Sequence, residues 1–322
     1  MNWLRFMCVG VLGVLPVLAA AQNYPTKPIR IISDSASGSP GDVALRLVAP
    51  KMSVGLGQPV IVEPRTGAGG QIAAGEVLKS GADGHTILFS TALILVSKFV
   101  MKSFRVDMER DFAPISLALR GNNFLAVHKS VPARNFREFV DFAKKNPGNL
   151  SFSSNGMGSS LHIQWVGVTL AAGIDLLHVP YGSGNNSMRV TDFFVGRTLA
   201  IMSPLGAMRR QLDAGEVRVL AMMADERNKS LPEVPAITEV LPGVRLATGF
   251  WGFWAALEVP PTIVNRLSGE IQKGYREPDV IARLESLDSI PVGSTPQEFA
   301  LAIANQMKIL KEIVGAAGIT PQ

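Results

Sequence analysis

The sequence predicts an α/β protein built as two lobes, each a doubly wound sheet with helices on both faces. The chain has 322 residues, which is more than a single hydrophobic core usually serves. Hydrophobic residues make up 47% and charged residues 18%, a composition typical of folded globular proteins and not of disordered chains. After the first two dozen residues, short apolar strands alternate with amphipathic helices almost to the end, a pattern that favours parallel sheets covered by helices.

The N-terminus is predicted to be a secretory signal peptide over residues 1–21. Arg5 precedes an apolar run over residues 6–20, and Ala19-Ala20-Ala21 supplies the small residues of a cleavage site. An uncleaved membrane anchor is the alternative, but the run is shorter than the roughly 20 residues that span a bilayer, and Pro16 interrupts it. Export and cleavage place the mature protein in the periplasm.

Cysteine content and charge exclude several classes of function. Cys8 is the only cysteine and leaves with the signal, so the mature chain has neither a disulfide nor a cysteine nucleophile. The net charge of +5 falls to +4 when Arg5 is removed, because 30 basic and 26 acidic residues remain. The basic residues are scattered without interleaved aromatics, so no nucleic-acid partner is predicted.

The predicted elements divide the mature chain into a first lobe at residues 24–122, a second lobe at residues 123–247, and a return to the first lobe at residues 248–322. Apolar runs predict strands at 28–32, 58–62, 86–90, 124–128, 176–181, 198–202, 216–222 and 250–257. Helical periodicity is predicted at 42–56, 70–80, 135–146, 188–194, 262–275, 279–286 and 296–317. The proline-rich stretch 231–243 is predicted to wrap the surface.

A glycine- and serine-rich run in the second lobe is the strongest candidate for a ligand site. Residues 152–162 are predicted to form a strand, a loop and the start of a helix. Ligands of open α/β sheets bind beyond the carboxyl ends of strands, and backbone N–H groups at a helix start hold anions without a charged side chain. The candidates in this run are Ser154, Asn155, Gly156, Gly158, Ser159 and His162.

His162 and the other candidate loops each have a plain structural interpretation beside the functional one. A histidine one turn into a helix more often packs or caps than binds a ligand. Tyr181 and Gly182 lie on the next loop of the second lobe, where the tyrosine either touches the ligand or fills a wall, and Ser203 follows a later strand.

The first lobe contributes two further candidate loops. Ser37, Gly38 and Ser39 precede Asp42, whose carboxylate is expected to cap its own helix or to hold the loop, since it would repel an anion directly. Ser90 and Thr91 end the third strand and either donate to a ligand or make a local turn.

The glycine-rich stretch 64–70 and the histidines give little support to catalysis. No lysine follows the glycines in Walker spacing, so the stretch is interpreted as tight strand–helix packing, with Arg65 a less favoured ligand contact. The histidines lie far apart without metal-ligand spacing, and no G-x-S-x-G elbow occurs. We therefore predict a binding protein without metal or cofactor, and keep an exported enzyme that acts on a small acid as the alternative.

The ordered set of short motifs resembles the Bug-type receptors of tripartite tricarboxylate transporters along nearly the whole mature chain. The matching segments are 24–30, 56–60, 65–70, 83–86, 111–114, 131–133, 146–148, 154–162, 178–181 and 291–299. The resemblance implies the type II periplasmic binding-protein fold, with two lobes that close on a hinge over a small carboxylated solute held by main-chain amides and waters. It also implies a membrane permease or a sensor domain as partner, and we expect a monomer.

Three positions differ from the pattern of that family, and all lie at the expected ligand cleft. The first loop reads Ser37-Gly38-Ser39-Pro40 where a proline and a glycine triplet are usual. Tyr181 is followed by Gly182-Ser183 in place of lysine-glycine, and Ser203 stands where an aspartate is common. The sequence therefore predicts an unusual ligand, or a receptor that no longer serves transport.

Overall fold

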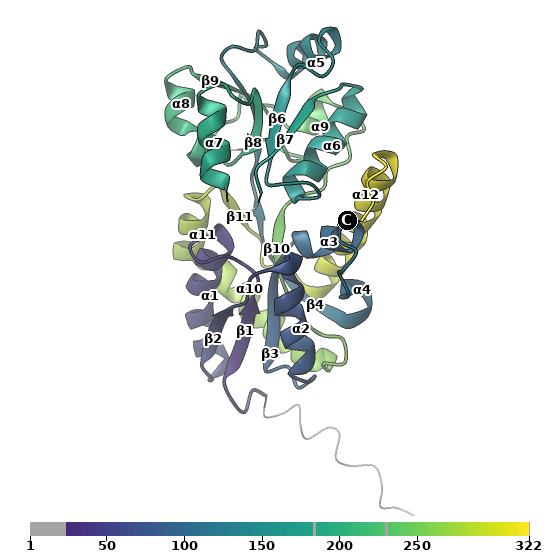
Figure 1. Ribbon diagram of the computed structural model, residues 1–322. Coiled ribbons are helices and arrows are strands. Elements are labelled where there is room, and N and C mark those ends of the chain that lie inside the picture. Colours follow the sequence, from purple (N-terminus) through teal and green to yellow (C-terminus); the bar gives the residue numbers. More distant parts are fainter. Residues whose placement is uncertain (1–23, 183–184, 229–230, 322) are drawn as a thin grey trace, which may run out of the picture.

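The chain folds into two lobes, each built on its own mixed β-sheet (Figure 1). A computed structural model describes residues 24–182, 185–228 and 231–321, so the predicted signal peptide lies outside the described residues. In the described part of the chain, no helix is long and apolar enough to cross a membrane.

The first lobe contains a six-stranded sheet in the order β11-β4-β10-β3-β1-β2. Four of its strands precede the second lobe in the sequence and two follow it, so the sheet combines both ends of the chain. The strands are β1 (Ile29–Ser33), β2 (Val60–Pro64), β3 (Thr86–Thr91), β4 (Phe112–Gly121), β10 (Phe250–Ala256) and β11 (Ser289–Pro291).

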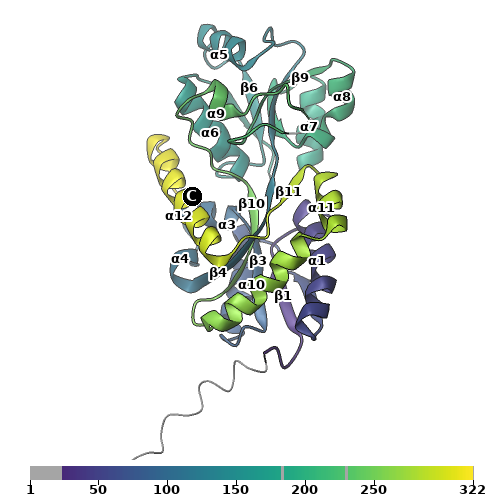
Figure 2. The same ribbon diagram turned by 180° about the vertical axis from the view of Figure 1, so that it is seen from behind.

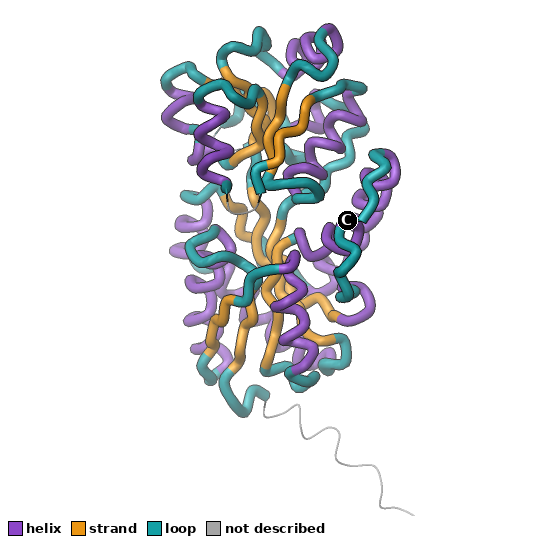
Figure 3. Tube along the Cα trace, in the orientation of Figure 1, coloured by secondary structure: helices purple, strands orange, loops and turns teal. Residues whose placement is uncertain are grey.

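The second lobe contains a five-stranded sheet in the order β7-β6-β8-β5-β9. All of its strands lie between the end of β4 and the start of β10 in the sequence, so two chain segments connect the lobes (Figures 1 and 3). The strands are β5 (Phe124–His128), β6 (Ser151–Ser154), β7 (Leu177–Pro180), β8 (Ala200–Ser203) and β9 (Val217–Met222).

Helices cover both faces of each sheet, as Figure 2 shows from behind for α10 and α12 on the first lobe. The helices of the first lobe are α1 (Pro40–Leu56), the 3-10 turn η1 (Ala68–Gly70), α2 (Gln71–Lys79), α3 (Leu93–Val100), α4 (Met108–Asp111), α10 (Pro261–Tyr275), α11 (Pro278–Glu285) and α12 (Pro296–Ala316). Those of the second lobe are α5 (Phe136–Lys145), α6 (Ser160–Ala172), α7 (Asn186–Phe194), η2 (Leu205–Ala207), α8 (Arg209–Asp213) and α9 (Ile237–Val240).

The central strands of each sheet are buried on both faces, which explains why they read as apolar runs in the sequence. In β1, Ile31 packs in one cluster with α1 and α10, while its neighbour Ile32 packs in another with α2, α3 and α12. In β5, Leu125 and Ala126 separate in the same way between two clusters of the second lobe. Alternate side chains of a strand point to opposite faces, so each sheet needs two helical layers.

Both sheets are mixed, whereas the sequence pattern favoured parallel sheets. Strand β1 pairs in parallel with β2 and β3, but β10 is antiparallel to both β3 and β4. In the second lobe β5 is antiparallel to β8 and β9. The cause is that the chain passes twice between the lobes. Strands β5 and β10 each start at the lobe boundary, where the neighbouring strands β8 and β3 end, so they run in the opposite direction.

Most predicted elements are present with ends shifted by one or two residues, but several were missed. The ten-residue strand β4 was not predicted, nor were α3, α4, α8 and β11. Helix α1 begins at Pro40 and not at residue 42, because the Ser39 side chain caps it by accepting a hydrogen bond from the Asp42 N–H. The surface stretch 231–243 contains the short helix α9.

Candidate functional site

The carboxyl ends of the parallel strands from both lobes meet at the boundary between the lobes. Strand β4 ends at Gly121 and β5 starts at Phe124, so this short connection marks the boundary. Ser203, at the end of β8, lies opposite Phe124. In the first lobe, Thr91 at the end of β3 lies opposite Trp251, at the start of β10. Topology therefore brings the predicted loops of both lobes to the same boundary.

The loop after β1 is held by the Asp42 carboxylate. Asp42 is buried and accepts hydrogen bonds from the Gly38 N–H at 2.9 Å and from Arg46 Nε at 3.0 Å. Ser37 and Gly38 are exposed and Ser39 is half-buried. Asp42 therefore holds the loop, which was one of the two roles expected for it. The other expected role, capping α1, is performed by Ser39.

Asp34, which sequence reasoning missed, lies beside Ser90 and Thr91 at the same edge. Its carboxylate accepts the Ser90 hydroxyl at 2.5 Å and the Thr91 N–H at 3.1 Å. The backbone of Gly70 covers it so closely that a Cβ there would lie 2.8 Å from Asp34 Oδ2. Burial raises the pKa of Asp34 to about 7, against the lowering effect of both hydrogen bonds. The signal available in the sequence was an aspartate directly after an apolar strand.

The loop between β6 and α6 contains most of the predicted residues of the second lobe. Ser154 is buried, and its hydroxyl contacts His178 Nε2 at 2.6 Å and accepts the Gly156 N–H at 3.1 Å. Ser159 caps α6 by accepting the His162 N–H. Asn155 Oδ1 is buried without a hydrogen-bond partner among the described residues. The first turn of α6 carries no acidic residue, so its N-terminal dipole is available to an anion.

His162 packs against a second histidine, His178, that sequence reasoning did not place in the site. The two rings stack at 4.3 Å, and Phe152 stacks on the other face of His178 at 4.8 Å. His162 Nδ1 accepts the Gly158 N–H at 3.1 Å. Burial lowers the pKa of His162, and burial together with the neighbouring His162 lowers the pKa of His178 to about 4. Both rings are therefore neutral supports of the loop at physiological pH.

Gly158 brings this loop against the first lobe. Its φ of +69° lies in the left-handed region, and a Cβ at this position would lie 2.8 Å from Val100 Cβ, at the end of α3. The contact requires glycine for both its conformation and its lack of a side chain. A solute at the start of α6 is thus within reach of the first lobe.

Tyr181 and Gly182 follow β7 beside the same loop. The Tyr181 N–H donates to Ser154 O at 3.0 Å, and its hydroxyl donates to Asp192 Oδ2 at 2.8 Å. A Cβ on Gly156 would lie 3.7 Å from the Cα of Gly182, so the two loops adjoin. The next two residues of the predicted loop, 183 and 184, lie outside the described residues.

Ser203 completes the predicted set at the end of β8. It is 1% exposed, and its hydroxyl has no hydrogen-bond partner among the described residues. The turn that follows contacts the first lobe, because the Gly206 N–H donates to Asp288 Oδ2 at 2.5 Å. Ser203 is therefore a buried polar group at the boundary between the lobes.

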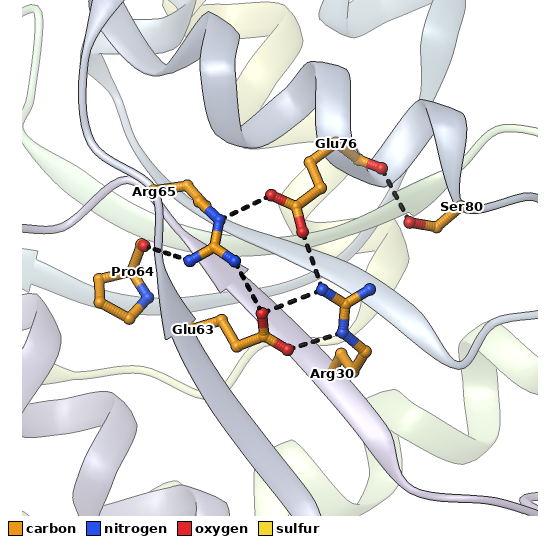
Figure 4. A network of polar contacts seen from close by, with 6 residues as sticks. All are labelled: Arg30, Glu63, Pro64, Arg65, Glu76 and Ser80. Carbon is orange, nitrogen blue, oxygen red and sulfur yellow. Dashed lines mark hydrogen bonds and ion pairs between the residues drawn. The ribbon is translucent and has the colours of Figure 1, made fainter.

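Arg65 directly follows the carboxyl end of β2, but its guanidinium is engaged in a network of two arginines and two glutamates (Figure 4). Arg65 pairs with Glu76 at 2.9 Å and Glu63 at 3.1 Å, and Arg30 bridges the same two carboxylates at 2.8 and 2.6 Å. The hydrogen bonds that Arg30 donates to Glu63 and Glu76 raise the pKa of Arg30. This pairing supports the packing interpretation of the glycine-rich stretch and not the ligand one.

Two surface hollows lie elsewhere on the molecule. One, of about 500 Å³, lies between α1 and β2 and includes Arg46 and Val62; the other, of about 250 Å³, lies between α6 and α12 and includes Gly167 and Glu312. Neither is lined by a predicted site residue. The candidate site is therefore defined by the strand ends and their loops.

The fold and the position of these loops define a class, the two-lobed α/β proteins that bind a solute between their lobes. A sequence profile described as "Tripartite tricarboxylate transporter family receptor" matches residues 44–319. The chain belongs to this family of receptors. The family decides between the two predicted functions in favour of a solute receptor, and it confirms the resemblance and the fold class seen in the sequence.

Individual relatives agree with this assignment. A "UPF0065 protein in tcbD-tcbE intergenic region" of Pseudomonas sp. (strain P51) is 34% identical over 279 residues, which cover 86% of this chain and 82% of the relative. A solved "periplasmic transporter" is 33% identical with a TM-score of 0.75, covering 92% of this chain and 99% of the other. A protein of R. palustris, solved with adipate, is 26% identical with a TM-score of 0.77, covering 93% and 100%.

Proposed function

We propose that this receptor captures a small carboxylated solute in the periplasm and delivers it to a membrane permease or a sensor domain. The observation that carries the proposal is the start of α6, which lies at the lobe boundary with no acidic residue in its first turn and faces Val100 of the first lobe. The adipate bound to the R. palustris relative is a solute of this chemistry.

The proposed mechanism is closure of the lobes around the solute. Residues 24–122 and 248–322 form one lobe in this proposal, residues 123–247 the other, and the two connecting segments act as the hinge. The solute's carboxylate docks at the loop residues Ser154, Asn155, Gly156, Gly158 and Ser159, with Tyr181, Gly182 and Ser203 beside them. Closure then adds the first-lobe loops and excludes water, which strengthens each dipole contact.

The working protein in this proposal is a monomer that begins near Gln22, after the signal peptide has been removed. The changed residues in its loops point to a solute different from that of most family members. Its binding needs several helix-terminus and hydrogen-bond contacts together, because each contributes only about 0.3–1 kcal/mol when exposed.

A screen of organic acids tests the proposal. The mature protein is mixed with adipate, malate, citrate, benzoate or aspartate, and the unfolding temperature is recorded. Binding stabilises the native state, so at a hundredfold excess over Kd we expect a gain of about 2.7 kcal/mol in unfolding free energy. Calorimetry of any acid that stabilises the protein checks for one-to-one binding without turnover. Failure of every acid to stabilise the protein, or release of a product, would contradict the proposal.

A further inference from the structure

Arg189 in α7 is a buried cation without a carboxylate partner. It is 1% exposed, and its guanidinium donates to Asn186 Oδ1 from Nη2 at 2.9 Å and from Nε at 3.3 Å, and to Met202 O from Nη1 at 3.2 Å. Both acceptors are neutral. All aspartate and glutamate side chains of the chain lie within the described residues, and none forms an ion pair with Arg189. Burial lowers its pKa to about 10, which leaves it cationic at neutral pH.

Two other buried charges of the described chain have counter-ions. Asp42 is 4% exposed and pairs with Arg46 at 3.0 Å, and Glu270 is 4% exposed and pairs with Arg266 at 2.6 Å and Lys273 at 2.9 Å. A buried charge without a counter-ion loses its hydration and receives only partial compensation from neutral acceptors. The charge of Arg189 is thus only partly compensated by the groups that surround it.

The guanidinium lies at the boundary where the solute is expected. Met202, which accepts one of its hydrogen bonds, immediately precedes Ser203, the last residue of β8. Asn186, which accepts the other two, is the first residue of α7. A guanidinium offers five N–H donors, of which these contacts use three. The Ser203 hydroxyl is buried at the same strand end without a partner.

We propose that Arg189 is the counter-ion of the solute, so that its guanidinium and the Ser203 hydroxyl bind a carboxylate of the ligand in the second lobe. This inference rests on the proposed function and adds a charged contact to a site otherwise made of neutral dipoles. It also names the ligand class as a fully ionised carboxylate, because an amide or ester of the same shape leaves the buried cation unneutralised. A planar guanidinium fits a carboxylate with two parallel hydrogen bonds.

Two substitutions separate this role from simple packing of α7 on β8. Arg189→Met keeps an unbranched apolar stem and removes the charge, and Arg189→Lys keeps the charge and removes the two-pronged geometry. Arg197→Met is the matched control, since Arg197 follows the same helix, is exposed and already pairs with Asp192 at 2.8 Å. Unfolding temperature without ligand and affinity for adipate, malate, citrate, benzoate and aspartate are measured for all four proteins.

We expect the unliganded Arg189→Met protein to be as stable as the unsubstituted one or more stable, because an unpaired buried charge has been removed. Its affinity for the acid that binds the unsubstituted protein falls at least tenfold, Arg189→Lys is intermediate, and Arg197→Met binds normally. Affinity unchanged in both Arg189 variants overturns the inference and leaves the proposed function standing. A strongly destabilised Arg189→Met with full affinity in Arg189→Lys also overturns it. No binding of any acid to the unsubstituted protein contradicts the proposed function itself.

Discussion

Replacing Gly158 by alanine tests whether the loop before α6 and the end of α3 are coupled across the lobe boundary. The added Cβ meets two costs. A residue other than glycine at φ +69° costs about 1–2 kcal/mol. The same Cβ lies 2.8 Å from Val100 Cβ, well inside the separation of about 3.5–4.0 Å at which two carbons attract, and such overpacking costs about 1–3 kcal/mol.

Gly173→Ala is the matched control for the first cost alone. Gly173 ends α6 with φ +60°, and a Cβ there has no atom within 4 Å. We therefore expect Gly173→Ala to lower the unfolding free energy by about 1–2 kcal/mol, and Gly158→Ala to lower it by about 2–5 kcal/mol, the sum of both costs.

Urea unfolding of the two variants, each with and without Val100→Ala, measures the coupling. Val100→Ala removes the two Cγ atoms, which lie 2.8 and 3.1 Å from the added Cβ, and leaves the Cβ contact at 2.8 Å. The penalty of Gly158→Ala is therefore smaller in that background, whereas the penalty of Gly173→Ala stays the same. Equal penalties for both glycines, or a Gly158 penalty that Val100→Ala does not change, would refute the close approach of the lobes at this loop.

Three further predictions concern buried titrating groups and a helix cap. The folded pKa of Asp34, about 7, exceeds its ordinary value of 3.8, so Asp34 lowers stability as pH rises from about 4 to 7, by at most about 4 kcal/mol. The folded pKa of His178, about 4, lies below its ordinary value of 6.5, so His178 lowers stability as pH falls from 6.5 to 4. The two effects oppose each other, and urea unfolding between pH 4 and 7 separates them. Relative to the unsubstituted protein, Asp34→Asn should lose stability on acidification and His178→Phe should gain it. Stability profiles that run parallel to that of the unsubstituted protein would count against both assignments. Thr295 and Glu298 form a capping box at the start of α12, so Thr295→Ala should cost about 1 kcal/mol in the same assay, and no loss would show that the cap is replaced.

The sequence predicted the two-lobed α/β fold well because the central strands of each sheet are buried on both faces. Strands such as β5 therefore read as continuous apolar runs, and serine caps mark where helices begin. Strand β4 escaped prediction because Pro114 and Ser116 interrupt its apolar pattern, and its pairing with β10 is set by tertiary structure. The antiparallel strands escaped for a related reason, since strand direction depends on how the chain passes between lobes.

The candidate site was predictable in its loops but not in its charges. Glycine, serine and the strand–loop–helix pattern identify the loop at residues 154–159 directly. Asp34 is marked in the sequence only by its place directly after an apolar strand, and Arg189 is not marked at all. A single sequence does not tell whether a charge in an apolar neighbourhood has a partner. Only the fold shows that Asp34 is covered by Gly70 and that Arg189 contacts neutral acceptors alone.

A crystal structure of the mature protein with the acid that binds most tightly would show where the solute binds. We predict that a carboxylate of the ligand lies between the lobes, within hydrogen-bond distance of main-chain N–H groups at the start of α6. Ligand bound on an outer surface, such as the hollow between α1 and β2, with the loop at residues 154–159 free of contacts, would contradict the account.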